Sequence, residues 1–178
     1  MFVFVDAGSE GFAGFYEASY SRIVALLAAM LGDWQQAEDI AQEAFARALA
    51  RWSRISGYDA PEAWVRQVAL RLVVDAGRRS RRALRASTLL AAGQRGRAEP
   101  SHPVDPTALF MALMRLPVPQ RQVLVMHYLA DLPVADIARD CQIPEGTVKT
   151  RLAAARARLE RELSSDSPDS SAEVPDAR

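Results

Sequence analysis

Positive charge is concentrated in two short stretches of the chain. Residues 66–85 contain seven arginines and one acid, Asp75. Residues 147–159 contain no acidic residue and carry a second group of cations: Lys149, Arg151, Arg156 and Arg158. Cations at this density pair with phosphates or with carboxylates. The first candidates for a ligand are therefore a nucleic acid and an acidic protein surface.

Candidate catalytic and metal-binding groups are few. Asp39 and Glu43 are four residues apart on an expected helix, the spacing of a catalytic carboxylate pair. No third group completes an acid–base site. No nucleophile–base pair or glycine-rich phosphate loop is visible. One cysteine, Cys141, and two histidines, His102 and His127, are too few for a disulfide framework or a cysteine-based zinc site. The sequence predicts a protein that is not an enzyme and uses no metal or cofactor.

Helices are expected to position the charged groups, because apolar residues recur at helical spacing and no alternating strand pattern is found. The spacing predicts helices over residues 12–31 and 34–52, a loop over 53–60, and a third helix from Pro61 onward, with Trp64 in the core. The second helix has a polar, acidic face and an apolar stripe for the core: Ala37, Ile40, Ala41, Ala44, Phe45, Ala48, Leu49 and Trp52.

The helical pattern fails after residue 82, where glycines and prolines replace large apolar groups. It resumes over residues 107–116, 119–129, 134–140 and 144–163. We predict an all-α chain with two small helical domains joined by a flexible linker, the second domain containing a helix-turn-helix. The expected boundaries are 1–82 for the first domain, 83–106 for the linker, 107–163 for the second domain and 164–178 for a disordered acidic tail.

The segment 134–148 has the layout of a helix-turn-helix. A short helix packs through Ile137 and Ala138, a tight turn buries Ile143, and Pro144 opens the second helix. Amides at the start of that helix and the cations beyond it suit DNA phosphates and base edges. An ordinary helical hairpin with solvated charges has the same spacing. Gln142 stands in the turn, where a left-handed backbone favours glycine.

Both halves resemble one family, the extracytoplasmic-function (group four) sigma factors of bacterial RNA polymerase. Residues 37–45 (AEDIAQEAF) are similar to the signature of the family's second conserved region. Residues 63–69 through Asp75, followed by Arg78 and Arg79, are similar to its promoter-recognition helix. Leu116-Pro117, the run 119–121 and residues 144–152 (PEGTVKTRL) resemble its fourth region. The three motifs occur in the family's order and with its intervening linker.

The resemblance implies a transcription initiation factor that binds core RNA polymerase, directs it to promoters and helps to melt them. The family docks onto polymerase through acidic and amide positions of the second helix, which correspond here to Asp39, Gln42 and Glu43. An acidic face fits a basic partner, although a solvated helix face has the same appearance. An anti-sigma factor is a further possible partner.

The loop and third helix resemble the part of the family that opens and reads the minus-ten element. The expected contacts are Tyr58, Arg66, Gln67, Arg71, Arg78 and Arg79. Tyr58 either stacks on an unpaired base or covers its own loop. Many members have asparagine where this chain has Arg71, which favours a phosphate contact there. The helix from Pro144 would read the minus-thirty-five element through Glu145, Gly146, Thr147, Lys149, Thr150, Arg151 and Arg156.

Overall charge does not oppose this interpretation. The 22 basic and 22 acidic residues cancel, but residues 1–50 hold two basic and seven acidic groups, and residues 51–100 hold eleven basic and four acidic ones. The N-terminal residues do not resemble a secretory signal, and no apolar run approaches the roughly 20 residues of a membrane span. We therefore expect a cytoplasmic protein. The main alternative is a helix-turn-helix transcriptional regulator that acts without being a polymerase subunit.

Overall fold

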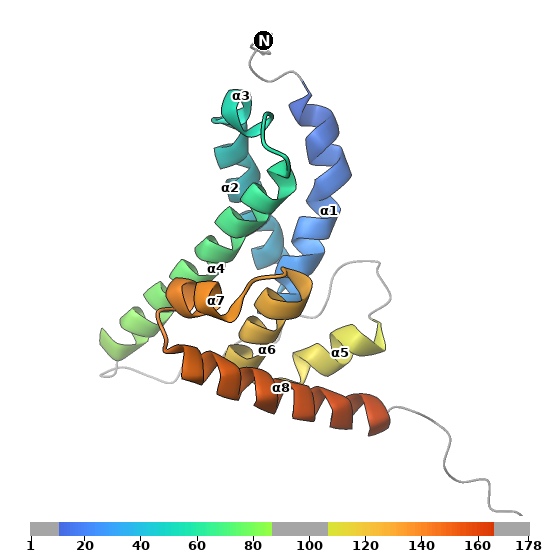
Figure 1. Cartoon of the computed structure of the whole chain (residues 1–178), viewed down its shortest axis with the longest axis vertical. Coiled ribbons are helices and arrows are strands. Elements are labelled where there is room, and N and C mark those ends of the chain that lie inside the picture. The colour runs from blue at the N-terminus through green and yellow to red at the C-terminus, as the bar shows by residue number, and fades with distance from the viewer. Residues whose placement is uncertain (1–10, 87–106, 166–178) are drawn as a thin grey trace, which may run out of the picture.

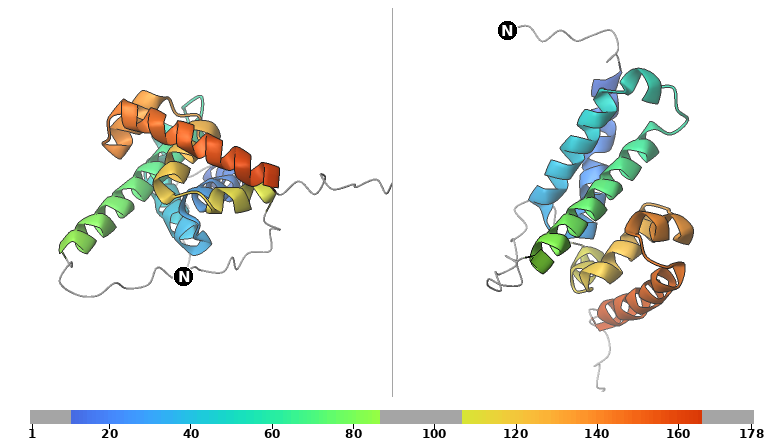
Figure 2. Two further views of the ribbon diagram at one scale, coloured as in Figure 1. Left: turned by 90° about the horizontal axis from the view of Figure 1, so that it is seen from below. Right: turned by 90° about the vertical axis from the view of Figure 1, so that its left-hand side faces the viewer.

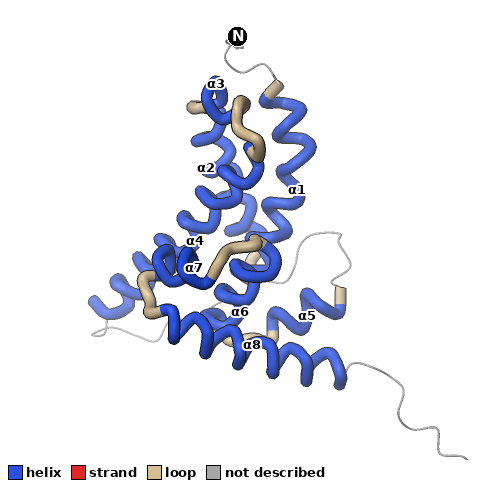
Figure 3. The backbone as a smooth tube through the Cα atoms, in the orientation of Figure 1, coloured by secondary structure: helices blue, strands red, loops and turns tan. Residues whose placement is uncertain are grey.

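The computed structural model describes residues 11–86 and 107–165, and the regular structure in these two ranges is entirely helical (Figures 1 and 3). The first range, here called the N-terminal part, contains α1 (Phe12–Leu31), α2 (Trp34–Leu49), α3 (Trp52–Ile55) and α4 (Pro61–Ala86). The second range, the C-terminal part, contains α5 (Ala108–Met114), α6 (Val118–Leu124), the π-helical segment η2 (Val125–Leu129), α7 (Val134–Cys141) and α8 (Glu145–Ser165). The predicted all-α chain in two helical parts is confirmed.

The N-terminal part is a bundle in which α1, α2 and α4 lie side by side (Figure 1). α1 ends at Leu31 and is capped by Gly32, whose φ of 75° is the left-handed conformation that glycine adopts without strain. The amide of Gly32 donates to the Ala28 carbonyl at 2.8 Å. α2 begins at Trp34 and is capped by Asp33, whose carboxylate accepts a 3.0 Å hydrogen bond from the amide of Gln36. These two local signals set the corner between the helices.

One expectation for the second helix is wrong. α2 ends at Leu49 instead of Trp52, and Trp52 together with residues 53–55 of the expected loop forms α3. Leu49, expected on the buried stripe, is 46% exposed. The reason is that α3 turns the chain back, so that Trp52 packs against Phe12 and Phe15 with ring centroids 5.3 and 4.9 Å apart. Trp52 thereby covers the end of the bundle, and Leu49 is left outside.

The C-terminal part is organised around α8, which packs against α5, α6 and α7. The expected helix 119–129 is present as α6 followed by η2. Val148, Leu152 and Ala155 of α8 are buried, as the periodicity predicts. Gln142, between α7 and α8, has φ 53° and ψ 47°, so the turn does use the left-handed conformation at a residue other than glycine. The amide of Ile143 returns to the Ala138 carbonyl at 3.0 Å and closes the turn.

The two parts pack against each other and share one continuous apolar core. The end of α1 lies against α5, α6 and η2, and α4 lies against α7 (Figures 1 and 2). α4 continues to Ala86, past the predicted domain end at residue 82. The predicted linker beyond Ala86 and the predicted tail beyond Ser165 lie outside the described residues. In the described ranges no helix is both long enough and apolar enough to span a membrane.

Candidate nucleic-acid interface

The predicted minus-ten contacts are spread along α4 and the loop before it. Pro61 occupies the first position of α4, where its missing amide hydrogen is not needed. Val65, Ala69 and Val73 hold one side of the helix in the core. The predicted contacts follow on the remaining surface: Arg66, Gln67 and Arg78 are half-buried, and Arg71 and Arg79 are exposed.

Two of these arginines converge on one residue of the other part. Nε of Arg71 lies 3.6 Å from the Oδ1 oxygen of Asp140 in α7. Nη2 of Arg78 donates to the backbone carbonyl of Asp140, and its Nη1 lies 3.3 Å from Oδ1 of Asp75. The sequence does not predict Asp140 as a partner of α4. These arginines therefore face the helix-turn-helix in this structure.

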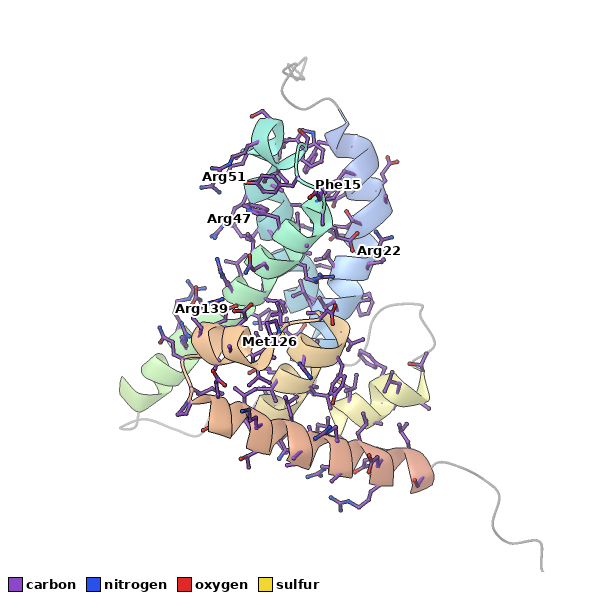
Figure 4. The ribbon with its side chains drawn as sticks, viewed as in Figure 1. Phe15, Arg22, Arg47, Arg51, Met126 and Arg139 are labelled. Carbon is purple, nitrogen blue, oxygen red and sulfur yellow. The ribbon has the colours of Figure 1, made fainter. Side chains whose placement is uncertain are left out.

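Tyr58 lies in the loop between α3 and α4 and is 37% exposed. Its amide donates to the Ile55 carbonyl at 3.0 Å, which holds the loop close to α3. Beside the loop is a group of exposed cations that the sequence motifs do not include: Arg47, Arg51 and Arg54. Arg47 and Arg51 project from the same side of the N-terminal part (Figure 4). Their spacing of four and seven residues is the sequence signal for a shared helical face.

Six of the seven predicted minus-thirty-five contacts lie in the first two turns of α8, and Arg156 lies just past the middle of the helix. Glu145, Gly146, Lys149, Thr150 and Arg156 are exposed, whereas Thr147 and Arg151 are half-buried. A Cβ at Gly146 would meet no atom within 4 Å, so the backbone is open to close approach there. The structure thus places all seven on the second helix of a helix-turn-helix, six of them at its start.

Local pairs restrain four of these side chains. Nζ of Lys149 lies 3.9 Å from Oε2 of Glu145, one turn earlier. Thr150 donates its hydroxyl hydrogen to the Gly146 carbonyl at 2.9 Å. Nη1 of Arg156 lies 3.4 Å from the hydroxyl oxygen of Tyr128, itself an exposed side chain. Such exposed pairs are weak and a phosphate can displace them.

The predicted polymerase contacts share the outer face of α2. Asp39, Gln42 and Glu43 are all exposed, while Ala37, Ala41 and Ala44 face the core. Nε of Arg47 lies 2.7 Å from Oε1 of Glu43. This i, i+4 pair orients the Glu43 carboxylate without burying it. The face therefore offers carboxylates and an amide to a partner.

A buried arginine to which the sequence assigns no role joins the two parts. Arg121 in α6 is only 5% exposed and donates to the carbonyl oxygens of Met30 at 3.2 Å and Leu31 at 2.8 Å, at the end of α1. Burial lowers the pKa of its guanidinium from the ordinary value. A Cβ at Gly32 would lie 3.0 Å from Nη2 of Arg121, so glycine also provides room for the guanidinium.

Within the described residues no group of three or more histidine, cysteine or acidic side chains is arranged to hold a metal ion. Asp39 and Glu43, the pair whose spacing imitates an acid–base site, are on an exposed helix face. The arrangement is suited to binding: an acidic helix face, a cationic helix with an exposed aromatic ring beside it, and a cationic helix-turn-helix.

Comparison with known proteins explains this combination. The family description of sigma-70 region 2 matches residues 15–83, and that of sigma-70 region 4 matches residues 107–159. The chain is 35% identical over 131 residues to the sigma factor SigL of Mycobacterium tuberculosis, covering 69% of this chain and 72% of SigL. The chain belongs to the extracytoplasmic-function sigma factors.

A second relative and one solved structure are also similar to the chain. The sigma factor SigW of Bacillus subtilis is 29% identical over 171 residues, which cover 86% of this chain and 89% of SigW. The fold is similar to that of the sigma factor RpoE in its co-crystal structure with the anti-sigma factor NepR from Bartonella quintana. That likeness has a TM-score of 0.58 and 22% identity, and covers 87% of this chain and 98% of RpoE.

The chain is therefore an RNA polymerase sigma factor that directs transcription initiation, and it is not an enzyme. The match to region 2 includes both the acidic segment of α2 and most of α4. A helix-turn-helix regulator without polymerase leaves that whole region unexplained, so this alternative is set aside.

Proposed function

We propose that the three surfaces divide the work of initiation. The acidic face of α2 (Asp39, Gln42, Glu43) docks onto polymerase. The α4 surface and its loop hold the opened minus-ten element, through Tyr58, Arg66, Gln67, Arg71, Arg78 and Arg79. α8 reads the minus-thirty-five element through Glu145, Gly146, Thr147, Lys149, Thr150, Arg151 and Arg156. The observation that carries this proposal is the separation of an exposed acidic helix face on α2 from cationic surfaces on α4 and α8.

The proposed mechanism is binding without catalysis. The acidic face attracts a basic partner surface and speeds association. Arginines along α4 neutralise backbone phosphates, and an aromatic ring in the loop stacks on a base that has left the duplex. The DNA-binding surfaces of α4 and α8 are each weak. Because they are on one chain and polymerase fixes their positions, binding of one element raises the effective concentration of the other surface at its own element. Capture of unpaired bases stabilises the open promoter.

The proposed units are residues 1–82 for polymerase docking and minus-ten recognition and 107–163 for minus-thirty-five recognition. Since bacterial RNA polymerase works on the chromosome, we place the protein in the cytoplasm. An anti-sigma factor is a candidate partner, since the relative RpoE of Bartonella quintana forms a crystalline complex with the anti-sigma factor NepR.

The experiment that tests this division is transcription in vitro with purified core polymerase, with transcript starts read by sequencing. We expect start sites that share upstream minus-ten and minus-thirty-five elements and that are absent without the protein. In gel-shift assays the promoters found should be bound specifically by the protein with core enzyme. Specific binding by the protein alone, at the same strength with or without core enzyme, would contradict the proposal.

A further inference from the structure

We propose that Tyr128 of η2 and Arg156 of α8 together hold one backbone phosphate of promoter DNA. The inference rests on the proposed function, which assigns Arg156 to the minus-thirty-five element and gives Tyr128 no role. In this contact the tyrosine hydroxyl and the guanidinium donate hydrogen bonds to oxygens of the same phosphate group. Tyr128 is thus a further DNA-binding residue, and it lies outside the helix-turn-helix.

The hydroxyl of Tyr128 and the guanidinium of Arg156 are already side by side. Nη1 of Arg156 donates to the hydroxyl oxygen at 3.4 Å. The other hydrogens of the guanidinium are not used in this pair, and the hydroxyl hydrogen has no acceptor among the described residues. Both groups can therefore donate to one further acceptor without breaking the pair. Donors at this separation can reach two oxygens of one phosphate.

The positive charge of Arg156 faces a neutral partner. Nζ of Lys149 lies 3.9 Å from a carboxylate oxygen of Glu145. Nε of Arg158 lies 3.9 Å from one of Glu162. In the described ranges no carboxylate forms an ion pair with Arg156, whose contact there is the Tyr128 hydroxyl. A hydroxyl does not neutralise the guanidinium, so Arg156 keeps more charge for an incoming phosphate than its two paired neighbours do.

The π-helical turn of η2 brings Tyr128 to the surface. In a regular α-helix Tyr128 would share a face with Leu124 and Val125, four and three residues earlier, and both of these are buried. In η2 the amide of Ala130 donates to the Val125 carbonyl, five residues earlier, at 3.0 Å. The extra residue in this turn rotates Tyr128 off the buried face, and its side chain is 53% exposed. Turns of this kind are frequent at functional sites.

The exposed ring of Tyr128 is held from behind. The ring of His127 packs edge-on against it, with centroids 4.7 Å apart and an interplanar angle of 71°. Nδ1 of His127 lies 2.9 Å from the carbonyl oxygen of Leu132. The amide of Leu132 donates in turn to the carbonyl of Met126, a fully buried residue, at 3.0 Å. A side chain restrained in this way loses little conformational freedom when it binds a ligand.

The position of the pair on α8 favours a DNA phosphate over a carboxylate of a protein partner. Arg156 follows Lys149 by seven residues, about two helical turns, so both side chains lie on the same side of α8. The proposed function places Lys149 at the minus-thirty-five element. The two positions are about 10 Å apart along the helix. Tyr128 and Arg156 therefore extend the contact of Lys149 along the DNA backbone.

The test measures binding of a promoter duplex, found by the transcription assay, to the full chain saturated with core polymerase. Tyr128→Phe removes the hydroxyl and keeps the ring. Leu129→Ala is the matched control, since Leu129 is the exposed neighbour in the same segment and has no side-chain donor for a phosphate. Affinity is measured over a series of salt concentrations. The affinity of each variant for core polymerase alone is measured in parallel.

We expect Tyr128→Phe to weaken promoter binding about threefold to tenfold, because a hydrogen bond to a charged group is lost. The slope of log affinity against log salt should not change, since the slope reports cations that neutralise phosphates and a hydroxyl is neutral. Arg156→Ala should weaken binding and also lower the slope. Leu129→Ala should leave the affinity and the slope unchanged.

The shared phosphate is located with duplexes in which one backbone phosphate at a time is replaced by an uncharged methylphosphonate. One replacement at the minus-thirty-five element should weaken binding of the unmodified protein more than that of Tyr128→Phe and Arg156→Ala. The same phosphate should be identified by both variants. Identification of two different phosphates would overturn the shared contact.

Each remaining outcome has a distinct meaning. Normal promoter binding by Tyr128→Phe, together with weakened binding by Arg156→Ala, would overturn the inference and leave the proposed function intact. If Arg156→Ala also binds normally, its assignment to the minus-thirty-five element is wrong as well. Weaker binding of Tyr128→Phe to core polymerase alone, at unchanged promoter affinity, would assign the pair to a carboxylate of the polymerase and refute the phosphate contact.

Discussion

The guanidinium of Arg121 donates a 2.8 Å hydrogen bond to the carbonyl oxygen of Leu31, 90 residues earlier in the chain. The last turn of α1 contains no basic residue of its own. Arg121 therefore supplies both the donors and the positive charge that the end of this helix lacks. A single side chain of the C-terminal part thus completes a helix of the N-terminal part.

Arg121→Met should destabilise the protein by about 2–4 kcal/mol, because it leaves two carbonyl oxygens without donors at a buried helix end. Urea unfolding followed by circular dichroism measures the change. Arg139→Met is the control, since the pair of Arg139 with Asp136 is exposed on one face of α7 and is expected to contribute no more than about 1 kcal/mol. Equal losses in the two variants would contradict a special role for Arg121.

Asp39→Arg combined with Glu43→Arg should reduce binding to core polymerase about a hundredfold or more, because like charges at an interface cost several kcal/mol. The fold should persist, since both side chains are exposed. Co-purification with core enzyme and circular dichroism measure the two effects. Glu17→Arg with Glu160→Arg makes the same change in net charge at exposed positions of α1 and α8. If this control loses binding equally, the effect is one of overall charge and not of the α2 face.

Lys149→Ala and Arg156→Ala should each weaken promoter binding, and each should lower the slope of log affinity against log salt by up to about one if the side chain contacts phosphate. The slope is measured for complexes with core polymerase over a series of salt concentrations. Arg161→Ala serves as the control, since this position is near the far end of α8, roughly 24 Å along the helix from Glu145. An unaltered slope for Lys149→Ala and Arg156→Ala would place these two side chains in solvent.

Tyr58→Ala should weaken binding of polymerase complexes to an unpaired minus-ten strand by about 1–3 kcal/mol, the range found for loss of base stacking on an aromatic ring. Tyr58→Phe keeps the ring and should bind nearly as well as the unmodified protein. The assay is competition with a single-stranded oligonucleotide. If both variants bind normally, the ring only covers its own loop.

Gln142→Gly should stabilise the protein by up to about 1 kcal/mol, because φ is 53° at this exposed position and glycine adopts that conformation without strain. The more flexible unfolded chain offsets part of the gain. Ala153→Gly, at an exposed position inside α8, should have the opposite sign at about 1 kcal/mol. Thermal unfolding distinguishes the two. A loss of stability in Gln142→Gly would mean that the side chain has a role the turn geometry does not show.

Much of the fold could be predicted because its signals are local. Gly32 and Asp33 mark the corner after residue 31, and the observed α1 has the predicted bounds. The apolar spacing of α8 correctly selects Val148, Leu152 and Ala155 for the core. Periodicity reports which face of a helix is buried, since the spacing of the apolar side chains follows directly from the helical repeat.

Periodicity is misleading where a neighbouring element decides the outcome. Periodicity alone extends the second helix to Trp52. In the structure Trp52 belongs to the separate short helix α3 and packs against the rings of Phe12 and Phe15. Leu49 lies outside the core as a result. A residue at the end of an amphipathic stripe is buried only if another element covers it, and the stripe does not carry that information.

The sequence by itself determined the helical class, the two parts, the helix-turn-helix and the candidate binding surfaces, because each depends on residues close together in the chain. Only the tertiary structure decided which surfaces meet. Arg78 donates to the carbonyl of Asp140, 62 residues away in the sequence. Arg121 donates to the carbonyls of Met30 and Leu31, which are 91 and 90 residues away. Helix spacing says that a face is apolar or charged but not which other face it contacts. That choice follows from the packing of the whole chain.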